Sequence, residues 1–432
     1  MQLNEGQEAA AQAVFQFLLS EDKEFILTGP AGVGKTFMMQ HIADNIMEQY
    51  RNGCRLLGIP IRLNKFQFTA TTNKAAEVLR NSTGEDVMTV HSYLGLKVRE
   101  DFKKGTYKLE TTGASVIHTG VVLFVDESSM IDTILKGFID KFMDDTCKII
   151  YVGDHCQMAP VGEIISPIYQ NPRHFVALTQ PVRNAGQPAL MALCNQLRAT
   201  VETGIFKPII EVPGVIDYIG DVELKDLLDN QFVDEDINAR ILCYTNARVQ
   251  EYNEYIREVR GYPDVFQPGE ILVNNNGIEF GKIMMRVEQQ FRVMEIVKQP
   301  YDKEIDKPSG TTMEVYDIRI RATGGSEYFE LVVSIPTDPA HYTRLCKYYA
   351  SRREWDTFWH LKKNYPDLRQ KDAATVYKAQ GSTYEWVICD LANIDAKCFD
   401  ADQVARMVYV AASRPTTRLY LYGRLTGKFN RS

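Results

Sequence analysis

The sequence lacks the features of membrane, secreted and zinc-binding proteins. No apolar run among its 432 residues is long enough to span a bilayer. The N-terminus has no basic segment followed by an apolar one, as signal peptides have. The eight cysteines form no C-x-x-C pair, which argues against a zinc site and indicates reduced thiols. These absences predict a cytoplasmic protein with no membrane attachment.

An excess of positive charge is also missing, since the formal net charge is −7. This argues against a protein that coats nucleic acid by charge alone, although a motor that moves along a strand needs only a local basic or polar track. Tandem repeats and low-complexity tracts are absent. Hydrophobic residues make up 45% of the chain and charged residues 24%, which is typical of a globular protein. The length predicts roughly two to four domains.

Short apolar runs recur along the chain, and a polar turn and a helical pattern follow each of them. This alternation predicts parallel sheets covered by helices on both faces, with ligands bound beyond the strand ends. The runs are Phe25 to Thr28, Phe66 to Ala70, Val121 to Val125, Lys148 to Val152, Phe175 to Leu178, Arg240 to Tyr244, Trp386 to Asp390 and Arg418 to Tyr422.

Three stretches depart from this alternation. Lys97 to Thr112 is polar, with a turn between two strand-like pieces, and predicts a β-hairpin inserted into the first sheet domain. The region from about Pro268 to Ile335 alternates polar and apolar residues between turns, which predicts a small β-rich insert. His341 to Asn364 is predicted to be helical, and its aromatic residues fit helix packing better than base stacking.

A glycine-rich loop, Gly29 to Thr36, lies between an apolar strand and a helical pattern from Phe37 to Met47. It has the G-x-x-x-x-G-K-T spacing of a phosphate loop in the strand-loop-helix context that this motif requires. Lys35 is predicted to neutralise the β- and γ-phosphates of ATP, and the Thr36 hydroxyl to bind Mg²⁺. Glycines let backbone N–H groups face the phosphates at a helix N-terminus; here they are Gly29, Gly32 and Gly34.

Two adjacent carboxylates, Asp126 and Glu127, follow the apolar run Val121 to Val125. Carboxylates at the end of a buried strand are costly unless they meet a cation. Asp126 is therefore predicted to hold the Mg²⁺ shell, and Glu127 to orient and deprotonate the attacking water. The alternative for such a pair is an ordinary solvated turn.

Further motifs appear in the order found in superfamily 1 helicases. Val125 to Met130, Gly153 to Gly162, Ala374 to Ser382 and Tyr409 to Arg414 resemble motifs II, III, V and VI of that family. The chain resembles the 5′-to-3′ group, called 1B, which includes Dda-like and RecD-like helicases. The resemblance covers nearly the whole chain.

The resemblance implies additional nucleotide contacts. Leu3 to Gln7 is similar to the family's Q motif, in which a glutamine reads adenine, so Gln7 is expected to bind the base. Gln157 stands at the position of the phosphate sensor in motif III. Gln380 and Gly381 of motif V are expected to contact the nucleotide.

Two arginines are expected to reach the γ-phosphate from the second sheet domain. Leu178 to Arg183 resembles motif IV, which assigns this role to Arg183, and Arg414 ends motif VI. A guanidinium group suits this role because phosphoryl transfer spreads negative charge over the γ-phosphate oxygens. Pro415 stands where glycine or alanine is commoner in the family.

The resemblance also implies DNA contacts in the first domain. Phe68 to Ala76 is similar to motif Ia, which assigns Thr72 and Asn73 to the DNA backbone. Asn73 stands where the family usually has histidine, so a hydrogen bond replaces base stacking there. Thr89 to Ser92 resembles motif Ib and points to His91, for which a loop histidine without DNA contact is the alternative.

In motif V the implied DNA contacts are Thr375, Tyr377 and Lys378, with Tyr377 at a position where the family often has histidine. The predicted hairpin stands where the family carries the pin that separates strands. Tyr107 or Phe102 is expected to stack on the base at the fork. The alternative is a solvated hairpin with an incidental aromatic residue.

The fold implied by the resemblance is α/β, with two RecA-like P-loop NTPase domains built on parallel sheets. An inserted β-hairpin (domain 1B) and an SH3-like β-rich insert (domain 2B) complete it. The predicted boundaries are 1–175 for domain 1A, with the pin hairpin at about 97–115, 176–267 for the first part of domain 2A, 268–366 for domain 2B with the helical aromatic segment, and 367–432 for the second part of domain 2A.

The expected function is an ATP- and Mg²⁺-dependent DNA helicase that moves 5′ to 3′ on single-stranded DNA and unwinds duplex DNA. Its expected partners are single-stranded and forked DNA, together with single-strand-binding or replication proteins. A monomer encoded by a phage and acting in the host cytoplasm fits the resemblance. Two alternatives stay open: an ssDNA-stimulated ATPase or translocase that does not unwind alone, and a nucleotide-dependent switch protein that does not act on nucleic acid.

Overall fold

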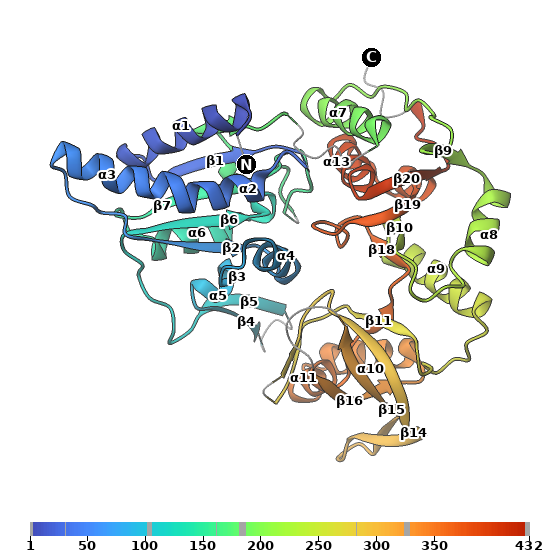
Figure 1. Ribbon diagram of the computed structural model, residues 1–432. Helices are drawn as coiled ribbons and strands as arrows, with labels where there is room; N and C mark the ends of the chain where they lie inside the picture. The colour runs from blue at the N-terminus through green and yellow to red at the C-terminus, as the bar shows by residue number, and fades with distance from the viewer. Residues whose placement is uncertain are drawn as a thin grey trace.

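The computed structural model describes residues 3–30, 32–101, 106–160, 162–180, 187–281, 283–323 and 329–427. Two sheet domains stand side by side, and a β-rich insert lies below them (Figure 1). No helix within the described ranges combines the length and the apolar character that a membrane crossing requires.

The first sheet contains six parallel strands in the order β3-β2-β6-β7-β1-β8. The central strands β6 and β7 are buried along almost their whole length, because helices cover both faces of the sheet. The strands are β1 Glu24–Thr28, β2 Lys65–Ala70, β3 Val87–Thr89, β6 Val121–Asp126, β7 Lys148–Gly153 and β8 Phe175–Ala177.

Helices on the two faces of this sheet form two separate apolar cores. Phe17 and Met39 contribute to the core on one face, and Leu135 and Ile139 to the core on the other. The predicted helix after the glycine loop is present. It contains a π-helical turn at Ile42–Ile46 and continues past its predicted end at Met47 to Leu57. The helices are α1 Glu5–Leu19, α2 Lys35–His41, the π-helical turn η1 Ile42–Ile46, α3 Met47–Leu57, α4 Asn73–Thr83, α5 Val90–Tyr93, the 3-10 turns η2 Ser128–Met130 and η3 Pro167–Tyr169, and α6 Thr133–Phe142.

The second sheet contains five parallel strands in the order β18-β10-β19-β20-β9. It is also covered on both faces, with Leu193 and Met407 in one core and Leu228 and Ile256 in the other. The strands are β9 Ile216–Ile219, β10 Ala239–Cys243, β18 Ala373–Thr375, β19 Tyr384–Asp390 and β20 Pro415–Tyr422. The helices are α7 Pro188–Thr203, α8 Asp221–Asn230, α9 Asn246–Val259, α12 Leu391–Lys397 and α13 Ala401–Ala412. Two parallel sheets of this kind confirm the predicted pair of RecA-like domains.

The insert between β10 and β18 is antiparallel, as predicted, with the strand order β16-β15-β14-β11-β17. Two helices pack beside it, and Tyr349 and Trp359 on these helices are buried, which confirms their predicted packing role. The elements are β11 Ile271–Asn274, β12 Ile278–Phe280, β13 Ile283–Met285, β14 Gln290–Asp306, β15 Thr311–Thr323, β16 Glu330–Pro336, β17 Leu368–Gln370, α10 Pro339–Ser351 and α11 Trp355–Asn364.

The predicted hairpin is also present. β4 Leu96–Asp101 and β5 Thr106–Thr111 form an antiparallel pair. Two predicted boundaries need correction, because strand pairing extends across them. β8 pairs with β1, so the first sheet reaches beyond residue 175. β17 pairs with β11, so the insert reaches beyond residue 366.

Candidate functional site

The glycine loop connects β1 to α2 in a conformation that requires glycine. Gly34 is the residue before α2 and has a φ of +84°, in the left-handed region, and Gly32 has a φ of +83°. A Cβ atom on Gly29 would lie 2.5 Å from the carbonyl oxygen of Leu178. Ala31 lies outside the described residues. The loop therefore keeps the backbone compact at the N-terminal end of α2, where an anion is favoured.

Lys35 lies at the start of α2 and has no carboxylate partner among the described residues. Its Nζ donates to the carbonyl oxygens of Gly29, at 2.7 Å, and Pro30, at 2.9 Å. Thr36 follows on the same helical turn. The lysine is thus held at the mouth of the loop by neutral groups, which leaves its charge available to a phosphate.

Gln7 is buried against this loop. Its Nε2 donates to the carbonyl oxygen of Val33 at 3.4 Å, and its Oε1 accepts from the backbone N–H of Asn4 at 3.2 Å. The second contact belongs to a capping box that begins α1. The structure therefore places Gln7 beside the glycine loop, while its recognition of adenine stays a prediction.

The acidic pair lies at the end of β6, which β7 separates from β1 and its glycine loop in the sheet order. Burial and the adjacent charge of Glu127 raise the pKa of Asp126 to about 7, and nearby Lys35 opposes this shift. The Oε2 atom of Glu127 is buried and has no hydrogen-bond partner among the described residues. Two under-neutralised carboxylate groups beside a phosphate loop fit a divalent cation, so the donor set suits Mg²⁺.

Glu127 itself has a φ of +51°, which is uncommon outside glycine. The hydroxyl of Thr71 donates to the carbonyl oxygen of Glu127 at 3.0 Å and helps to hold this conformation. Thr71 lies in the predicted DNA-binding motif Ia, but this contact was not predicted. The hydrogen bond joins the backbone of the predicted catalytic residue Glu127 to the segment directly before α4.

The second sheet domain reaches this site through the loop after β18. The Nε2 atom of Gln380 donates to the hydroxyl of Ser129 at 3.1 Å, while its Oε1 is buried without a partner in the described part of the chain. A Cβ atom on Gly381 would lie 3.9 Å from Oε1 of Glu127. The Oε1 of Gln157 is likewise buried and unpartnered among the described residues. Gln157 of the first domain and Gln380 of the second therefore each keep a buried amide oxygen without a partner among the described residues, and Gly381 brings the second domain to the acidic pair.

Of the two predicted arginine contacts, only that of Arg414 involves a residue that the structure describes. Arg183 lies outside the described residues. Arg414 is buried, and its guanidinium group donates to the carbonyl oxygens of Val410 and Ser382, both at 3.1 Å, and to the hydroxyl of Ser413. All of these acceptors belong to the second sheet domain, so Arg414 is held within its own domain in this structure. Its contact with a γ-phosphate stays a prediction that requires a rearrangement of the side chain.

A buried ionic network that the sequence did not reveal joins the two sheet domains. Asp154, directly after β7, is fully buried and accepts from Nη1 of Arg198 on α7 at 2.5 Å and from the hydroxyl of Tyr409 on α13 at 2.5 Å. Arg406 on α13 donates to the carbonyl oxygens of His155, at 2.5 Å, and Gln157, at 2.9 Å. The loop that carries Gln157 is therefore fixed to helices of the second domain.

The predicted DNA contacts of the first domain lie near the ends of β2 and β3. Thr72 and Asn73 are exposed at the start of α4, and the Thr72 hydroxyl accepts from the backbone N–H of Ala75 at 3.1 Å. His91 lies on α5, and burial lowers the pKa of its ring. In the hairpin, Tyr107 pairs with Glu100 through the backbone of β5. Phe102 lies outside the described residues, as does the Tyr107 side chain.

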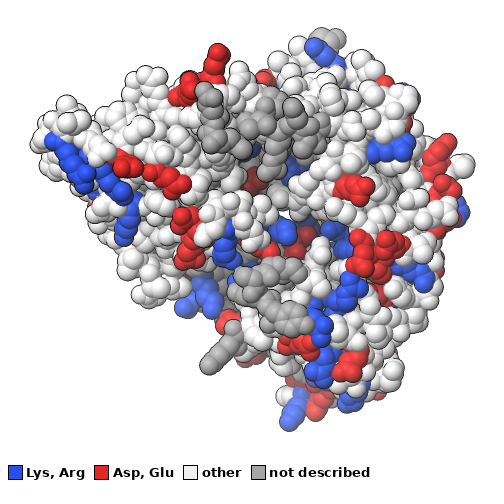
Figure 2. All heavy atoms as spheres, viewed as in Figure 1, with Lys and Arg blue, Asp and Glu red and all other residues white. Residues whose placement is uncertain are grey.

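In the second domain, Thr375 ends β18 and is nearly buried, and Tyr377 and Lys378 follow in the loop. The Tyr377 hydroxyl accepts from Nε2 of Gln403 at 2.5 Å, and its ring packs against the core of this domain. Basic side chains lie around the hollow between the two sheet domains and the insert, with acidic side chains beside them (Figure 2). The predicted contacts thus lie on both sheet domains, as a track that crosses from one to the other requires.

Comparison with known proteins gives matches over most of the chain. Residues 2–205 match the family described as AAA domain, and residues 372–422 match the UvrD-like helicase C-terminal domain. The chain is 24% identical over 450 residues to the ATP-dependent DNA helicase dda of Enterobacteria phage T4, a match that covers 95% of this chain and 97% of that protein. It is 26% identical over 156 residues to the RecBCD enzyme subunit RecD of Buchnera aphidicola, covering 31% of this chain and 23% of that protein.

Among solved structures, the Pif1 helicase from Bacteroides in complex with ADP-AlF3 and ssDNA is similar to the whole chain. The match has a TM-score of 0.50 and 14% identity, and it covers 100% of this chain and 95% of the other. At this identity the likeness shows a common fold, in agreement with the two parallel sheets and the antiparallel inserts.

Proposed function

The chain belongs to the superfamily 1B helicases related to Dda, and from this premise we propose that it uses ATP hydrolysis to move 5′ to 3′ along single-stranded DNA and to unwind duplex DNA. One observation carries the proposal: the second sheet domain reaches the acidic pair of the first, where Gly381 lies against Glu127 and Gln380 donates to Ser129. A nucleotide bound there would contact both domains, so its hydrolysis would change how they fit together.

Each side chain of the first domain has a distinct task in this proposal. Lys35 neutralises the β- and γ-phosphates, and the Thr36 hydroxyl and the Asp126 carboxylate would hold Mg²⁺. When bound, Mg²⁺ would supply positive charge that stabilises the transferring phosphate. The carboxylate of Glu127, with one oxygen unpartnered among the described residues, orients the attacking water and takes its proton. Gln7 binds the adenine.

Groups from both domains sense the nucleotide, namely Gln157 from the loop after β7 in the first domain and Gln380 from the loop after β18 in the second. Gln380 and Gln157 each offer a buried amide oxygen without a partner in the described part of the chain, which can accept a hydrogen bond from the attacking water. Arg183 and Arg414 stabilise the charge of the transferring phosphoryl group after the domains close. Because Arg406 on α13 donates to the carbonyl oxygen of Gln157, a movement of Gln157 would be transmitted directly to α13.

DNA is held by residues of both sheet domains, so a change in their separation becomes a step along the strand. We assign Thr72, Asn73 and His91 to the first contact area, and Thr375, Tyr377 and Lys378 to the second. The likeness to Dda supports a monomer that is encoded by a phage, acts in the host cytoplasm and cooperates with single-strand-binding or replication proteins.

Single-stranded DNA is expected to raise the ATPase rate, because both DNA-contact areas connect to the nucleotide site. The size of an ordinary coupling between two ligands predicts stimulation of about five- to 100-fold. Steady-state ATP hydrolysis with and without an oligo-dT strand measures this. Unwinding of duplexes with either a 5′ or a 3′ single-stranded tail then tests the activity and its direction.

The outcomes separate the alternatives. No stimulation by DNA would favour a nucleotide-dependent switch that does not act on nucleic acid. Stimulation without unwinding of either duplex would indicate a translocase that does not unwind alone. Unwinding that needs a 3′ tail would contradict the proposed direction.

Tyr107→Ala is expected to reduce the number of base pairs unwound per ATP hydrolysed. Stacking of a base on an aromatic side chain is worth about 1–3 kcal/mol, so the loss should be at least about fivefold. Tyr107→Phe keeps the ring and is the matched control, which should unwind nearly as well as the wild type. Equal unwinding by the alanine and phenylalanine variants would reject Tyr107 as the wedge and leave the hairpin as a solvated element.

A further inference from the structure

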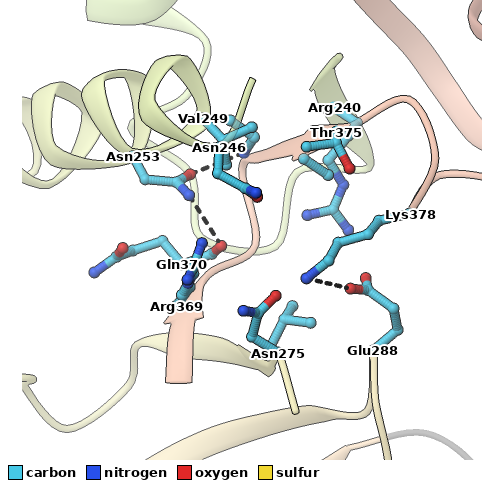
Figure 3. Close-up of a pocket in the computed structure, with 13 residues that line it drawn as sticks. Arg240, Asn246, Val249, Asn253, Asn275, Glu288, Arg369, Gln370, Thr375 and Lys378 are labelled. Atoms are coloured by element: carbon cyan, nitrogen blue, oxygen red, sulfur yellow. Dashed lines mark hydrogen bonds and ion pairs between the residues drawn. The ribbon is translucent and has the colours of Figure 1, made fainter. Parts of the chain in front are cut away.

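A pocket lies where the second sheet meets the β-rich insert, on the side of the loop after β18 (Figure 3). Its walls come from β10, the first turns of α9, the end of β11 and the segment around β17 and β18. Polar and apolar side chains both line it, and Val249 and Val273 are among the apolar ones. The polar ones include Arg240, Asn246, Glu288, Arg369, Thr375 and Lys378.

Arg240 is the unusual member of this group. Its residue surface is only 6% exposed, and its Nε is buried with no hydrogen-bond partner in the described part of the chain. The guanidinium carbon lies 5.0 Å from the centroid of the Tyr384 ring, and no ion pair joins the group to a carboxylate of the described residues. By contrast, the equally buried Arg260 is paired with Asp372 at 2.7 Å. A buried guanidinium group without an anionic partner is costly, so a bound anion would stabilise Arg240.

The rest of the pocket would favour an anion. Among the described lining, Arg240, Arg369 and Lys378 are basic and Glu288 is acidic. Arg369 is already paired with Asp367 at 2.8 Å, so Arg240 and Lys378 are the cations left to attract an anion. Nζ of Lys378 lies 3.5 Å from Oε1 of Glu288, and burial lowers the pKa of Lys378. Figure 3 shows Arg240 and Lys378 extending toward the same space, with Asn246 opposite them. Asn246 begins α9, a helix of 14 residues whose N-terminal end adds positive potential.

We propose that this pocket binds one phosphate group of the single-stranded DNA backbone, with Arg240 and Lys378 as its cationic ligands and Asn246 as a neutral donor. The inference deepens the proposed function and rests on it. Thr375 and Lys378, already assigned to DNA, form one wall of the pocket, so a strand that contacts them passes its opening. A planar guanidinium suits a phosphate because it donates two parallel hydrogen bonds. Since the pocket touches both the sheet and the insert, a phosphate there connects them.

The test is the salt dependence of DNA binding by the full chain. Affinity for a fluorescent oligo-dT strand is measured by anisotropy over a series of KCl concentrations. Arg240→Gln should weaken binding by about tenfold or more. It should also reduce the slope of log K against log salt by about 0.7, because one phosphate contact is lost. Arg55→Gln, on α3 in the first domain, removes a charge far from the pocket and should change neither value.

A second variant protects the test against a folding defect in Arg240→Gln. Asn246→Asp places a carboxylate in the pocket at a helix start, where an acidic residue is well tolerated. It should weaken DNA binding about tenfold, whereas the matched Asn52→Asp on α3 should not. Wild-type affinity and slope in both Arg240→Gln and Asn246→Asp would overturn the proposal.

Free inorganic phosphate has the same chemistry as a phosphate group of DNA, and thermal unfolding distinguishes the two. If inorganic phosphate raises the unfolding temperature of the wild type but not of Arg240→Gln, while DNA binding is equal in both, the pocket takes a free anion and the DNA assignment is wrong. If the wild type itself does not bind DNA, the proposed function fails. If the wild type binds DNA and the pocket variants bind it equally well, only this inference fails.

Discussion

Lys35→Ala is expected to reduce the maximal ATPase rate by about 10³-fold, because the transferring phosphate loses its fixed cation. In the structure, Nζ of Lys35 is held by the carbonyl oxygens of Gly29 and Pro30 and by no carboxylate of the described residues. Removal of the charge therefore breaks no ion pair among the described residues, and beyond the loss of its influence on the pKa of Asp126 its effect should fall on the nucleotide. The measurement is the rate at saturating ATP and oligo-dT, together with the affinity for a fluorescent ATP analogue.

Glu127→Gln is the matched control for that experiment. It keeps the size of the side chain but removes the base, so turnover should fall by about 10²- to 10⁴-fold with little change in nucleotide affinity. Lys35→Ala should lower both turnover and affinity. Wild-type turnover in a folded Lys35→Ala protein would refute the assignment of this loop to ATP.

Asp154→Ala is expected to lower the stability of the chain by about 3–5 kcal/mol, because it leaves the buried guanidinium of Arg198 without its partner. The hydroxyl of Tyr409 also loses its acceptor. Thermal unfolding followed by circular dichroism should show a decrease of roughly 6–20 °C in the midpoint. Because Asp154 joins the two sheet domains, stimulation of the ATPase by DNA should decrease in the same variant when it is assayed below its midpoint.

Tyr409→Phe separates the hydroxyl from the rest of the network. It keeps the ring in the core and removes one hydrogen bond, so its cost should be about 1 kcal/mol. If Asp154→Ala unfolds at the same temperature as Tyr409→Phe, the ion pair with Arg198 contributes little, and the contact between the domains does not depend on it.

The sheets and the glycine loop were predictable because each depends on neighbouring residues. A buried parallel strand is apolar along its length, and the loop must follow such a strand and precede a helix. For the same reason Asp126 and Glu127 could be assigned from the strand that precedes them. The boundaries at β8 and β17 were missed because a short strand of three residues carries little pattern, and its pairing partner is distant in sequence.

Contacts between the domains were not predictable from local patterns. Asp154 meets Arg198 and Tyr409, which are 44 and 255 residues away along the chain, and an arginine on a helix is usually a surface residue. Arg240 did leave a signal, since it is the one charged residue within the apolar strand Ala239–Cys243. A charge in a fully buried strand needs a partner, but the sequence could not say that the partner is missing.

The connection between the two sheets begins at the nucleotide loop. Leu178 follows β8, its backbone N–H donates to the carbonyl oxygen of Thr28 at 2.8 Å, and its own carbonyl oxygen lies against Gly29. The chain therefore enters the second sheet domain from a point beside the glycine loop, while the β-rich insert lies below the two sheet domains (Figure 1). Because displacement grows with distance from a pivot, a small rotation at this connection would move the insert farther than it moves the residues beside the loop.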